Sequence, residues 1–267
     1  MHIRVPASSA NLGPGFDVLG MAIDRYMELE FADEDIGSPD HLAVRVFRQY
    51  GGVGGLKITS TIPPGRGLGF SGTARIAGLL AAAVQQGKTL EECRRWLFLE
   101  ATELEGHPDN VAPAVFGGVT VAVDDRVVKI PLDIQANVIL WVPETPSGTR
   151  ESRRKLPESV PMADAVFNMG RAALLIAALS TGDTELLADA TEDRLHQGIR
   201  LRSLPETAAA MHAARDAGAW CSWLSGSGPT AAALCEPSVA DAVAAAMPAG
   251  GEVSISHIDM RGAVCEE

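Results

Sequence analysis

The feature that most constrains the fold is a strand, a glycine-rich loop and a helix that follow one another. Residues 56–62, Leu-Lys-Ile-Thr-Ser-Thr-Ile, alternate β-branched and other side chains, which predicts a strand. Residues 71–86 are rich in Ala and Leu and end before Gly87, as a helix with a C-terminal glycine does. Residues 63–74 between them read Pro-Pro-Gly-Arg-Gly-Leu-Gly-Phe-Ser-Gly-Thr-Ala. A chain with this order places an adaptable loop at the start of a helix.

This loop has the construction of a phosphate site. Its alternate glycines let the backbone wrap an anion, and the free N–H groups at the start of the helix point toward it. Ser71 or Thr73 can offer a hydroxyl to phosphate or Mg²⁺. The loop lacks the Lys before Ser/Thr that a P-loop requires, and its glycine spacing differs from the dinucleotide fingerprint. The sequence predicts a phosphate site of another type.

The rest of the chain interleaves helical and extended segments, which indicates an α+β architecture. At 267 residues and 46% hydrophobic, the chain can bury a substantial core. The predicted strands are residues 21–31, 117–123, 127–130 and 138–142, and the predicted helices are residues 89–104, 164–179, 184–190, 206–217 and 239–246.

Composition limits the partners. The formal net charge of −12 argues against a nucleic-acid-binding protein, because such proteins carry basic patches. The cysteines have no CxxC spacing, so neither zinc nor a disulfide framework is indicated. The first residues show no signal peptide, and the Ala-rich runs are too short to cross a bilayer. We expect a cytoplasmic protein without nucleic-acid or membrane partners.

Two polar segments could contribute to a site. Residues 6–17 place Asn11 and Asp17 around two glycines, where they could converge on one polar ligand, although an ordinary turn explains the composition equally well. Residues 105–113 are densely polar: Glu105 could ligate Mg²⁺, His107 could bind a carboxylate or hydroxyl, and Asn110 could orient an attacking hydroxyl. The alternative there is a helix end followed by a proline turn.

A third segment, residues 223–230, reads Trp-Leu-Ser-Gly-Ser-Gly-Pro-Thr. Its neighbours are apolar, so a hairpin or a strand-to-helix turn is a strong alternative to a role in binding. A hydrolase that uses Ser225 or Ser227 is a poor interpretation, because neither serine lies in a Gly-x-Ser-x-Gly elbow.

Taken in order, these segments resemble the GHMP kinases, and their residue patterns are most similar to those of the homoserine kinase family. The resemblance covers effectively the whole chain. It is carried by residues 11–20, 67–69, 105–110, 167–175, 192–197 and 225–230.

The resemblance implies two tightly joined α+β halves. Residues 1–145 would form a nucleotide-binding part like domain 2 of ribosomal protein S5, and residues 146–267 a ferredoxin-like part. ATP and L-homoserine would meet between them with Mg²⁺, and phosphoryl transfer to the side-chain hydroxyl would give O-phospho-L-homoserine for threonine biosynthesis. The resemblance also makes a homodimer a fair expectation.

Residue roles follow from the same resemblance. The homoserine-binding set is Asn11, Asp17, His107, Arg153 and Arg200. The triphosphate loop comprises Pro63, Gly65, Arg66, Gly67, Leu68, Gly69, Ser71, Gly72 and Thr73. The resemblance implies Ser71 and Glu105 as the Mg²⁺ ligands, with Glu100 or Glu103 as alternatives to Glu105. The catalytic candidates are His107, Asp109 and Asn110. Arg153 also fits a solvated basic run, since it lies in a cluster of cations.

Two departures from the usual pattern bear on chemistry. Asn110 stands where related kinases carry a catalytic Asp, which implies positioning and charge neutralisation with no strong base, while Asp109 remains a candidate base. Phe70 stands where the family usually has Ser, so one hydroxyl is missing. Two alternatives therefore stay open: a GHMP kinase for another small hydroxylated acid or amino alcohol, and a catalytically silent nucleotide-binding relative.

Overall fold

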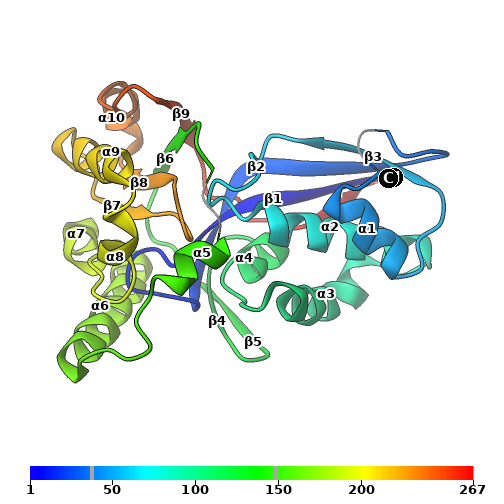
Figure 1. Cartoon of the computed structure of the whole chain (residues 1–267), viewed down its shortest axis with the longest axis horizontal. Helices are drawn as coiled ribbons and strands as arrows, with labels where there is room; N and C mark the ends of the chain where they lie inside the picture. Colours follow the sequence, from blue (N-terminus) through cyan, green and yellow to red (C-terminus); the bar gives the residue numbers. More distant parts are fainter. Residues whose placement is uncertain (37–38, 147–148, 267) are drawn as a thin grey trace.

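The computed structural model describes residues 1–36, 39–146 and 149–266. Two antiparallel sheets organise the chain, one on each side of a central junction (Figure 1). The first has the order β10-β1-β2-β4-β5, and β3 pairs with the far end of the long β2. Its strands are β1 His2–Ala10, β2 Leu19–Ala32, β3 Gly55–Ser60, β4 Val119–Val123, β5 Arg126–Ile130 and β10 Val264–Glu266.

Helices pack against one face of this sheet (Figure 1). They are α1 Leu42–Gln49, α2 Phe70–Gln85, α3 Leu90–Glu105 and α4 Val111–Phe116. The Ala-rich α2 is buried along most of its length, because α1, α3 and the sheet surround it. Gly78 permits the close approach of α1, since a Cβ there would lie 2.4 Å from the Ala43 carbonyl oxygen. This packing holds the start of α2 against the end of β1.

The second sheet has the order β7-β8-β6-β9, so its first strand lies between its third and fourth, as in a ferredoxin-like β-α-β-β-α-β unit. Its strands are β6 Asn137–Pro143, β7 Cys221–Leu224, β8 Ala231–Cys235 and β9 Gly251–Ser256. The remaining helices are α5 Thr149–Arg154, α6 Met162–Thr181, η1 Thr184–Leu186, α7 Leu187–Ala190, α8 Gln197–Leu201, α9 Pro205–Asp216, η2 Pro237–Val239 and α10 Ala240–Ala245. The α+β architecture is confirmed, and α5 lies at the junction of the two sheets (Figure 1).

The sheets do not follow the boundary expected between residues 145 and 146. Strand β6 lies before this boundary but belongs to the second sheet, where it pairs with β8 along one edge and with β9 along the other. Its apolar residues are almost all buried, so its backbone N–H and C=O groups need hydrogen-bond partners on both edges. Strand β10 lies near the other end of the chain but returns to pair with β1. The helix expected at residues 239–246 is followed by two strands, β9 and β10, that the sequence does not predict.

The predicted helix at residues 89–104 is confirmed in detail. Thr89 Oγ1 accepts a hydrogen bond from the Glu92 N–H, while the Glu92 carboxylate accepts one from the Thr89 N–H, which completes a capping box. The helix ends at Gly106 with φ of 90°. This end is important for function because the polar residues after it enter the pocket described below.

Helix α6 is long and apolar enough to span a membrane by length and composition alone. One such helix is weak evidence for a membrane protein. Its inner face, which includes Asn168 and Leu175, is buried in the fold, whereas Met162, Val166 and Met169 are exposed.

Candidate active site

A cleft of about 150 Å³ lies at the junction of the two sheets. Most of the predicted site residues line it: Asn11, Asp17, Gly65, Arg66, Gly67, Gly69, Ser71, Glu105, His107, Asp109, Asn110, Arg153 and Arg200. Four other lining residues received no role from the sequence, namely Phe16, Phe70, Gly226 and Ser227. Segments far apart in the chain therefore meet in one pocket.

Four predicted phosphate-loop residues do not line the cleft: Pro63, Leu68, Gly72 and Thr73. Leu68 is 1% exposed and packs in the core. The hydroxyl of Thr73 is buried and donates to the Pro6 carbonyl at 3.0 Å, so it ties α2 to β1. This differs from the predicted role of Thr73 and leaves Ser71 as the hydroxyl that faces the cleft.

The glycine loop has a backbone conformation that residues other than glycine rarely adopt. Gly65, Gly67 and Gly69 have φ of 68°, 75° and 71°. A Cβ on Gly67 would lie 2.3 Å from the Ser225 carbonyl oxygen, and one on Gly69 would lie 2.1 Å from Ser8 Oγ. Gly69 is the N-cap of α2 and supplies no side-chain cap, so the first N–H groups of this long helix face the cleft.

Residues 223–230 form the β7–β8 hairpin, as the structural alternative proposed. The hairpin supports the glycine loop through a chain of buried hydrogen bonds. Trp223 Nε1 donates to Ser9 Oγ at 2.9 Å, the hydroxyls of Ser9 and Ser225 are 2.8 Å apart, and Ser225 Oγ donates to the Gly67 carbonyl at 2.6 Å. Thr230 donates to the Arg66 carbonyl at 2.6 Å. The Ser225 hydroxyl thus stabilises the glycine loop through its hydrogen bond to the Gly67 carbonyl and is not a nucleophile.

The loop after β1 is strained. Asn11, Leu12 and Asp17 have φ of 70°, 48° and 59°, a region that non-glycine residues rarely adopt. The Asn11 side chain stabilises this shape, since its Oδ1 accepts from the Asp17 N–H at 3.1 Å and its Nδ2 donates to the Gly226 carbonyl at 2.9 Å. Asn11 lines the cleft but uses its amide to place Asp17.

Three charged side chains gather at this end. Arg153 on α5 donates to both carboxylate oxygens of Asp17, at 2.5 and 2.7 Å. Arg200 is 3% exposed and forms no ion pair with any described residue. Both guanidinium groups lie 5.3 Å from the centre of the Phe16 ring. Burial, reinforced by the charge of Arg153, lowers the pKa of Arg200. Arg200 is thus a buried cation beside a second cation, an arrangement that a bound anion would stabilise.

A second polar group follows α3. His107 Nδ1 lies 2.8 Å from Asp109 Oδ1, which also accepts from Asn110 Nδ2 at 3.2 Å. Asn110 Oδ1 accepts from Ser8 Oγ at 2.9 Å. Burial acts to lower the pKa of His107, but the hydrogen bond and charge of Asp109 and the charge of Asp17 outweigh it, so the pKa is raised.

The two proposed metal ligands lie together. Ser71 Oγ donates to Glu105 Oε2 at 3.0 Å. Oxygen ligands of Mg²⁺ at about 2.1 Å in an octahedron lie roughly 3 Å apart, so the spacing of this pair matches two such ligands, although the guanidinium of Arg75 contacts both oxygens and would have to move for a metal ion to bind. Arg75, one helical turn after Ser71, contacts both side chains and was missed, although spacing of four residues on a helix predicts this contact. The described residues contain no cluster of three His, Cys, Asp or Glu, so phosphate oxygens would complete such a site.

Phe70 begins α2 and lines the cleft beside the glycine loop. Its ring meets His41 edge to face, with 5.7 Å between the ring centres. His41 caps α1, because its Nδ1 accepts from the Ala43 N–H at 3.2 Å. Phe70 thus joins an aromatic wall where the usual pattern has a hydroxyl.

Comparisons with known proteins agree with this geometry. The family model described as the GHMP kinases N terminal domain matches residues 40–118, and the GHMP kinases C terminal model matches residues 175–253. A homoserine kinase of Gloeobacter violaceus is 41% identical over 92% of this chain and 91% of its own length. A homoserine kinase of Thermus thermophilus is 41% identical over 87% of this chain and 86% of its own.

Solved structures extend the comparison to the fold. The crystal structure of homoserine kinase from Cytophaga hutchinsonii superimposes with a TM-score of 0.84 at 27% identity, covering 99% of this chain and 96% of that one. A mevalonate kinase at 13% identity, with a TM-score of 0.71 and coverage of 97% and 99%, shares the fold. The glycine loop, the charged pocket and these relatives lead to one assignment: the chain belongs to the homoserine kinase family of the GHMP kinase superfamily.

Proposed function

We propose that this protein transfers the γ-phosphoryl group of ATP to the side-chain hydroxyl of L-homoserine and forms O-phospho-L-homoserine. It is then a phosphotransferase with an alcohol acceptor, acting in threonine biosynthesis. The glycine loop and the start of α2 hold the triphosphate through backbone N–H groups. The charged end of the same cleft holds the acceptor.

The buried, unpaired guanidinium of Arg200 is the observation that carries the choice of acceptor. A carboxylate bound there gains a charge-assisted hydrogen bond from a buried guanidinium. Asp17 and Arg153 neutralise each other in the free protein, and a zwitterion can replace this pair with its own ammonium and carboxylate. The ammonium of an amino acid can pair with Asp17, and its carboxylate can pair with Arg153 and Arg200. A simple hydroxy acid lacks the ammonium and leaves Asp17 without a ligand partner.

The reaction is a direct displacement. The acceptor hydroxyl oxygen attacks the γ-phosphorus, the bond from that phosphorus to the β–γ bridging oxygen breaks, and ADP leaves. A loose transition state requires mainly in-line placement and charge stabilisation. Asn110 acts by position, since its amide contacts Ser8 and Asp109. Asp109 is the proposed acceptor of the hydroxyl proton, with His107 as its hydrogen-bond partner.

Mg²⁺ is part of the proposal. Ser71 and Glu105 would hold it, and it would neutralise charge on the phosphate oxygens when bound. Arg75 forms an ion pair with the Glu105 carboxylate and adds a fixed positive charge next to the glycine loop.

The test is an ADP-release assay with Mg-ATP that compares L-homoserine with L-threonine, L-serine, pantoate and no acceptor. Saturable turnover on homoserine above all others is the expected result. Turnover on another acceptor would assign the chain to a sister kinase. ATP binding without turnover on any acceptor would instead make it the silent relative and refute the proposal.

Two truncated acceptors sharpen this test. 4-Hydroxybutyrate lacks the ammonium of homoserine, and 3-aminopropan-1-ol lacks its carboxylate. Both should be poor acceptors for the unsubstituted protein. In Asp17→Asn the advantage of homoserine over 4-hydroxybutyrate should shrink, while its advantage over 3-aminopropan-1-ol should persist. Equal losses for all three acceptors would contradict the assignment of Asp17 to the ammonium.

We further propose that the protein is cytoplasmic and homodimeric, without nucleic-acid or membrane partners. Its acidic net charge and its free cysteines support the first part, and the exposed apolar residues of α6 offer a surface for a second copy. Light scattering should give twice the chain mass of 28.0 kDa.

A further inference from the structure

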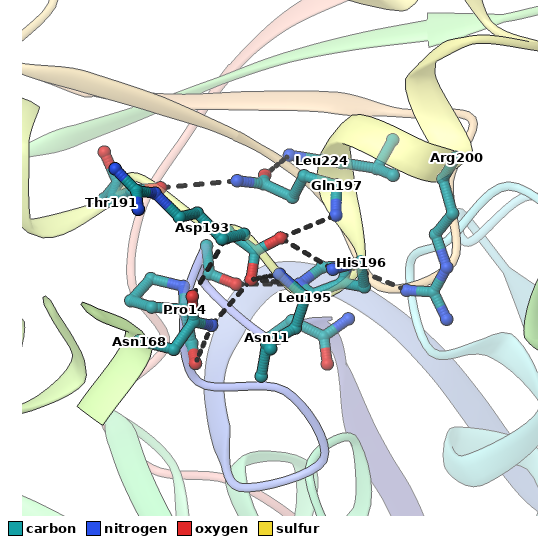
Figure 2. Close-up of polar contacts among 12 residues, drawn as sticks. Asn11, Pro14, Asn168, Thr191, Asp193, Leu195, His196, Gln197, Arg200 and Leu224 are labelled. Atoms are coloured by element: carbon teal, nitrogen blue, oxygen red, sulfur yellow. Dashed lines mark hydrogen bonds and ion pairs between the residues drawn. The ribbon is translucent and has the colours of Figure 1, made fainter. Parts of the chain in front are cut away.

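The motif at residues 192–197 has no role in the proposed chemistry, yet it is buried directly behind the acceptor end of the cleft. Asp193 and His196 have fully buried side chains. Figure 2 shows them between the loop after β1 and Arg200. A buried ionisable pair next to a substrate-binding cation calls for an explanation.

Asp193 fixes the backbone of this motif. Its Oδ2 accepts from the N–H groups of His196 and Gln197 at 2.8 and 2.7 Å, and its Oδ1 accepts from the Leu195 N–H at 3.2 Å. Asn168 of α6 donates a further hydrogen bond to Oδ1 at 2.7 Å (Figure 2). The carboxylate is satisfied by four donors, so it sets the entry of α8 without needing a cation.

The two ring nitrogens of His196 have different partners. Nε2 lies 2.8 Å from the Gly13 carbonyl oxygen, which only accepts, so Nε2 carries the proton. Nδ1 lies 3.0 Å from Nη1 of Arg200, which only donates, so Nδ1 is unprotonated. His196 is therefore neutral and bridges the strained loop to Arg200 (Figure 2). Burial and Arg200 lower the pKa of His196 against the pull of Asp193, which agrees with this form.

Arg200 depends on this bridge for its position. Its Nη1 is held by His196 and, at 3.2 Å, by the Gly226 carbonyl. Its Nε is buried and has no hydrogen-bond partner in the parts of the chain that the structure describes. The Phe16 ring lies 5.3 Å from both the Arg200 and the Arg153 guanidinium groups, and its centre lies 5.1 Å from the centre of the His196 ring. One edge of the guanidinium is thus fixed, which leaves the rest of it for the cleft.

We propose that His196 is a positioning residue: its unprotonated Nδ1 orients Arg200 to receive the carboxylate of the acceptor. This rests on the proposed function of Arg200. His196 touches no substrate itself. It couples the loop that carries Asp17 to the cation at the opposite side of the acceptor, so the two charges that recognise a zwitterion keep a fixed spacing.

Two variants separate the two ring nitrogens. In His196→Asn the side-chain oxygen lies near the position of Nδ1 and can still accept from Arg200. In His196→Gln the amide lies near the position of Nε2 and can still donate to Gly13, but nothing remains to accept from Arg200. The matched controls are His212→Asn and His212→Gln, because His212 lies exposed on α9.

Steady-state kinetics with L-homoserine, 3-aminopropan-1-ol and ATP give the readout. We expect His196→Gln to raise KM for homoserine about tenfold to a hundredfold, the effect of one hydrogen bond to a charged group. His196→Asn should stay within about threefold, since it keeps that acceptor. KM for ATP and kcat/KM for 3-aminopropan-1-ol should change little in either variant, because neither reagent brings a carboxylate to Arg200.

The outcomes are distinct. An equal rise of KM for homoserine in both variants, or equal losses for both acceptors, would mean that His196 only supports the fold and would overturn the inference. An unchanged KM in both would overturn it as well. KM describes the folded fraction, so partial unfolding lowers apparent kcat without imitating the expected split. Turnover of homoserine by the unsubstituted protein tests the proposed function separately, and its failure would overturn both.

Discussion

The two ends of the cleft are lined by different chemical groups. The phosphate end is made of backbone: three glycines in left-handed conformations and the start of α2. The acceptor end is made of ionised side chains, Asp17, Arg153 and Arg200, that come from three separate segments. Under the proposed function, the first end recognises the triphosphate by shape and by fixed dipoles, and the second recognises the acceptor by charge. Substitutions should therefore act by steric exclusion at one end and by loss of charge pairing at the other.

The largest effect is expected from Arg200→Met. Truncating one partner of a buried charge pair costs about 2–5 kcal/mol, so kcat/KM for homoserine should fall about a hundredfold or more while KM for ATP stays within a small factor. Arg202→Met, an exposed cation two residues away, is the control. A rise of KM for ATP as large as the loss of kcat/KM for homoserine would contradict the division of the cleft into two ends.

Gly67→Ala should act at the phosphate end instead. The new Cβ would lie 2.3 Å from the Ser225 carbonyl oxygen in a backbone with φ of 75°, so the loop must move. We expect KM for ATP to rise about tenfold or more with roughly 2 kcal/mol of lost stability. Gly87→Ala has φ of 83° but meets nothing within 4 Å, so it carries only the conformational cost. Equal kinetics in the two variants would show that shape does not govern this end.

Ser225→Ala tests the support behind the glycine loop. It removes the hydroxyl that donates to the Gly67 carbonyl and leaves Ser9 with one partner fewer. Denaturant unfolding should show a loss of about 1–2 kcal/mol, with a rise of KM for ATP of a few fold and little change for homoserine. Ser238→Ala at the exposed surface is the matched control. A larger change for homoserine than for ATP would contradict the assigned support.

The smallest effect concerns pH. The pKa of His107 is raised in the folded protein, so the folded state keeps its proton to higher pH than the unfolded state. The stabilisation is full below the pKa of the unfolded chain and is lost as pH rises through the folded pKa. The difference in unfolding free energy between the unsubstituted protein and His107→Gln should therefore shrink from pH 6 toward pH 9 (about the His range and above it). A difference in unfolding free energy that does not change with pH would contradict the raised pKa of His107.

The local sequence predicts the glycine loop and α2 in outline, and the binding of phosphate there stays a prediction. Alternate glycines before an Ala-rich helix have a local cause, so the loop and α2 were found. Thr73 was misjudged because its hydroxyl meets the Pro6 carbonyl, a contact between segments that no local pattern records. Arg75 was overlooked although helical spacing from Ser71 would have indicated it.

The residues of the acceptor end are proposed from resemblance alone, and their binding role stays a prediction. Asp17, Arg153 and Arg200 carry no shared spacing, because chain topology rather than local sequence brings them together. The same reason explains β6 and β10: which sheet a strand joins depends on partners that lie far along the chain. Local patterns therefore predict elements well and long-range pairing poorly.

The hydrogen-bond chain from Trp223 to the glycine loop also has a spectroscopic consequence. The indole is 1% exposed, and its N–H is two hydroxyls away from the Gly67 carbonyl. A displacement of that carbonyl would therefore reach a buried indole of the second sheet through these hydrogen bonds. We expect nucleotide bound at the glycine loop to change the fluorescence of Trp223, one of four tryptophans in the chain.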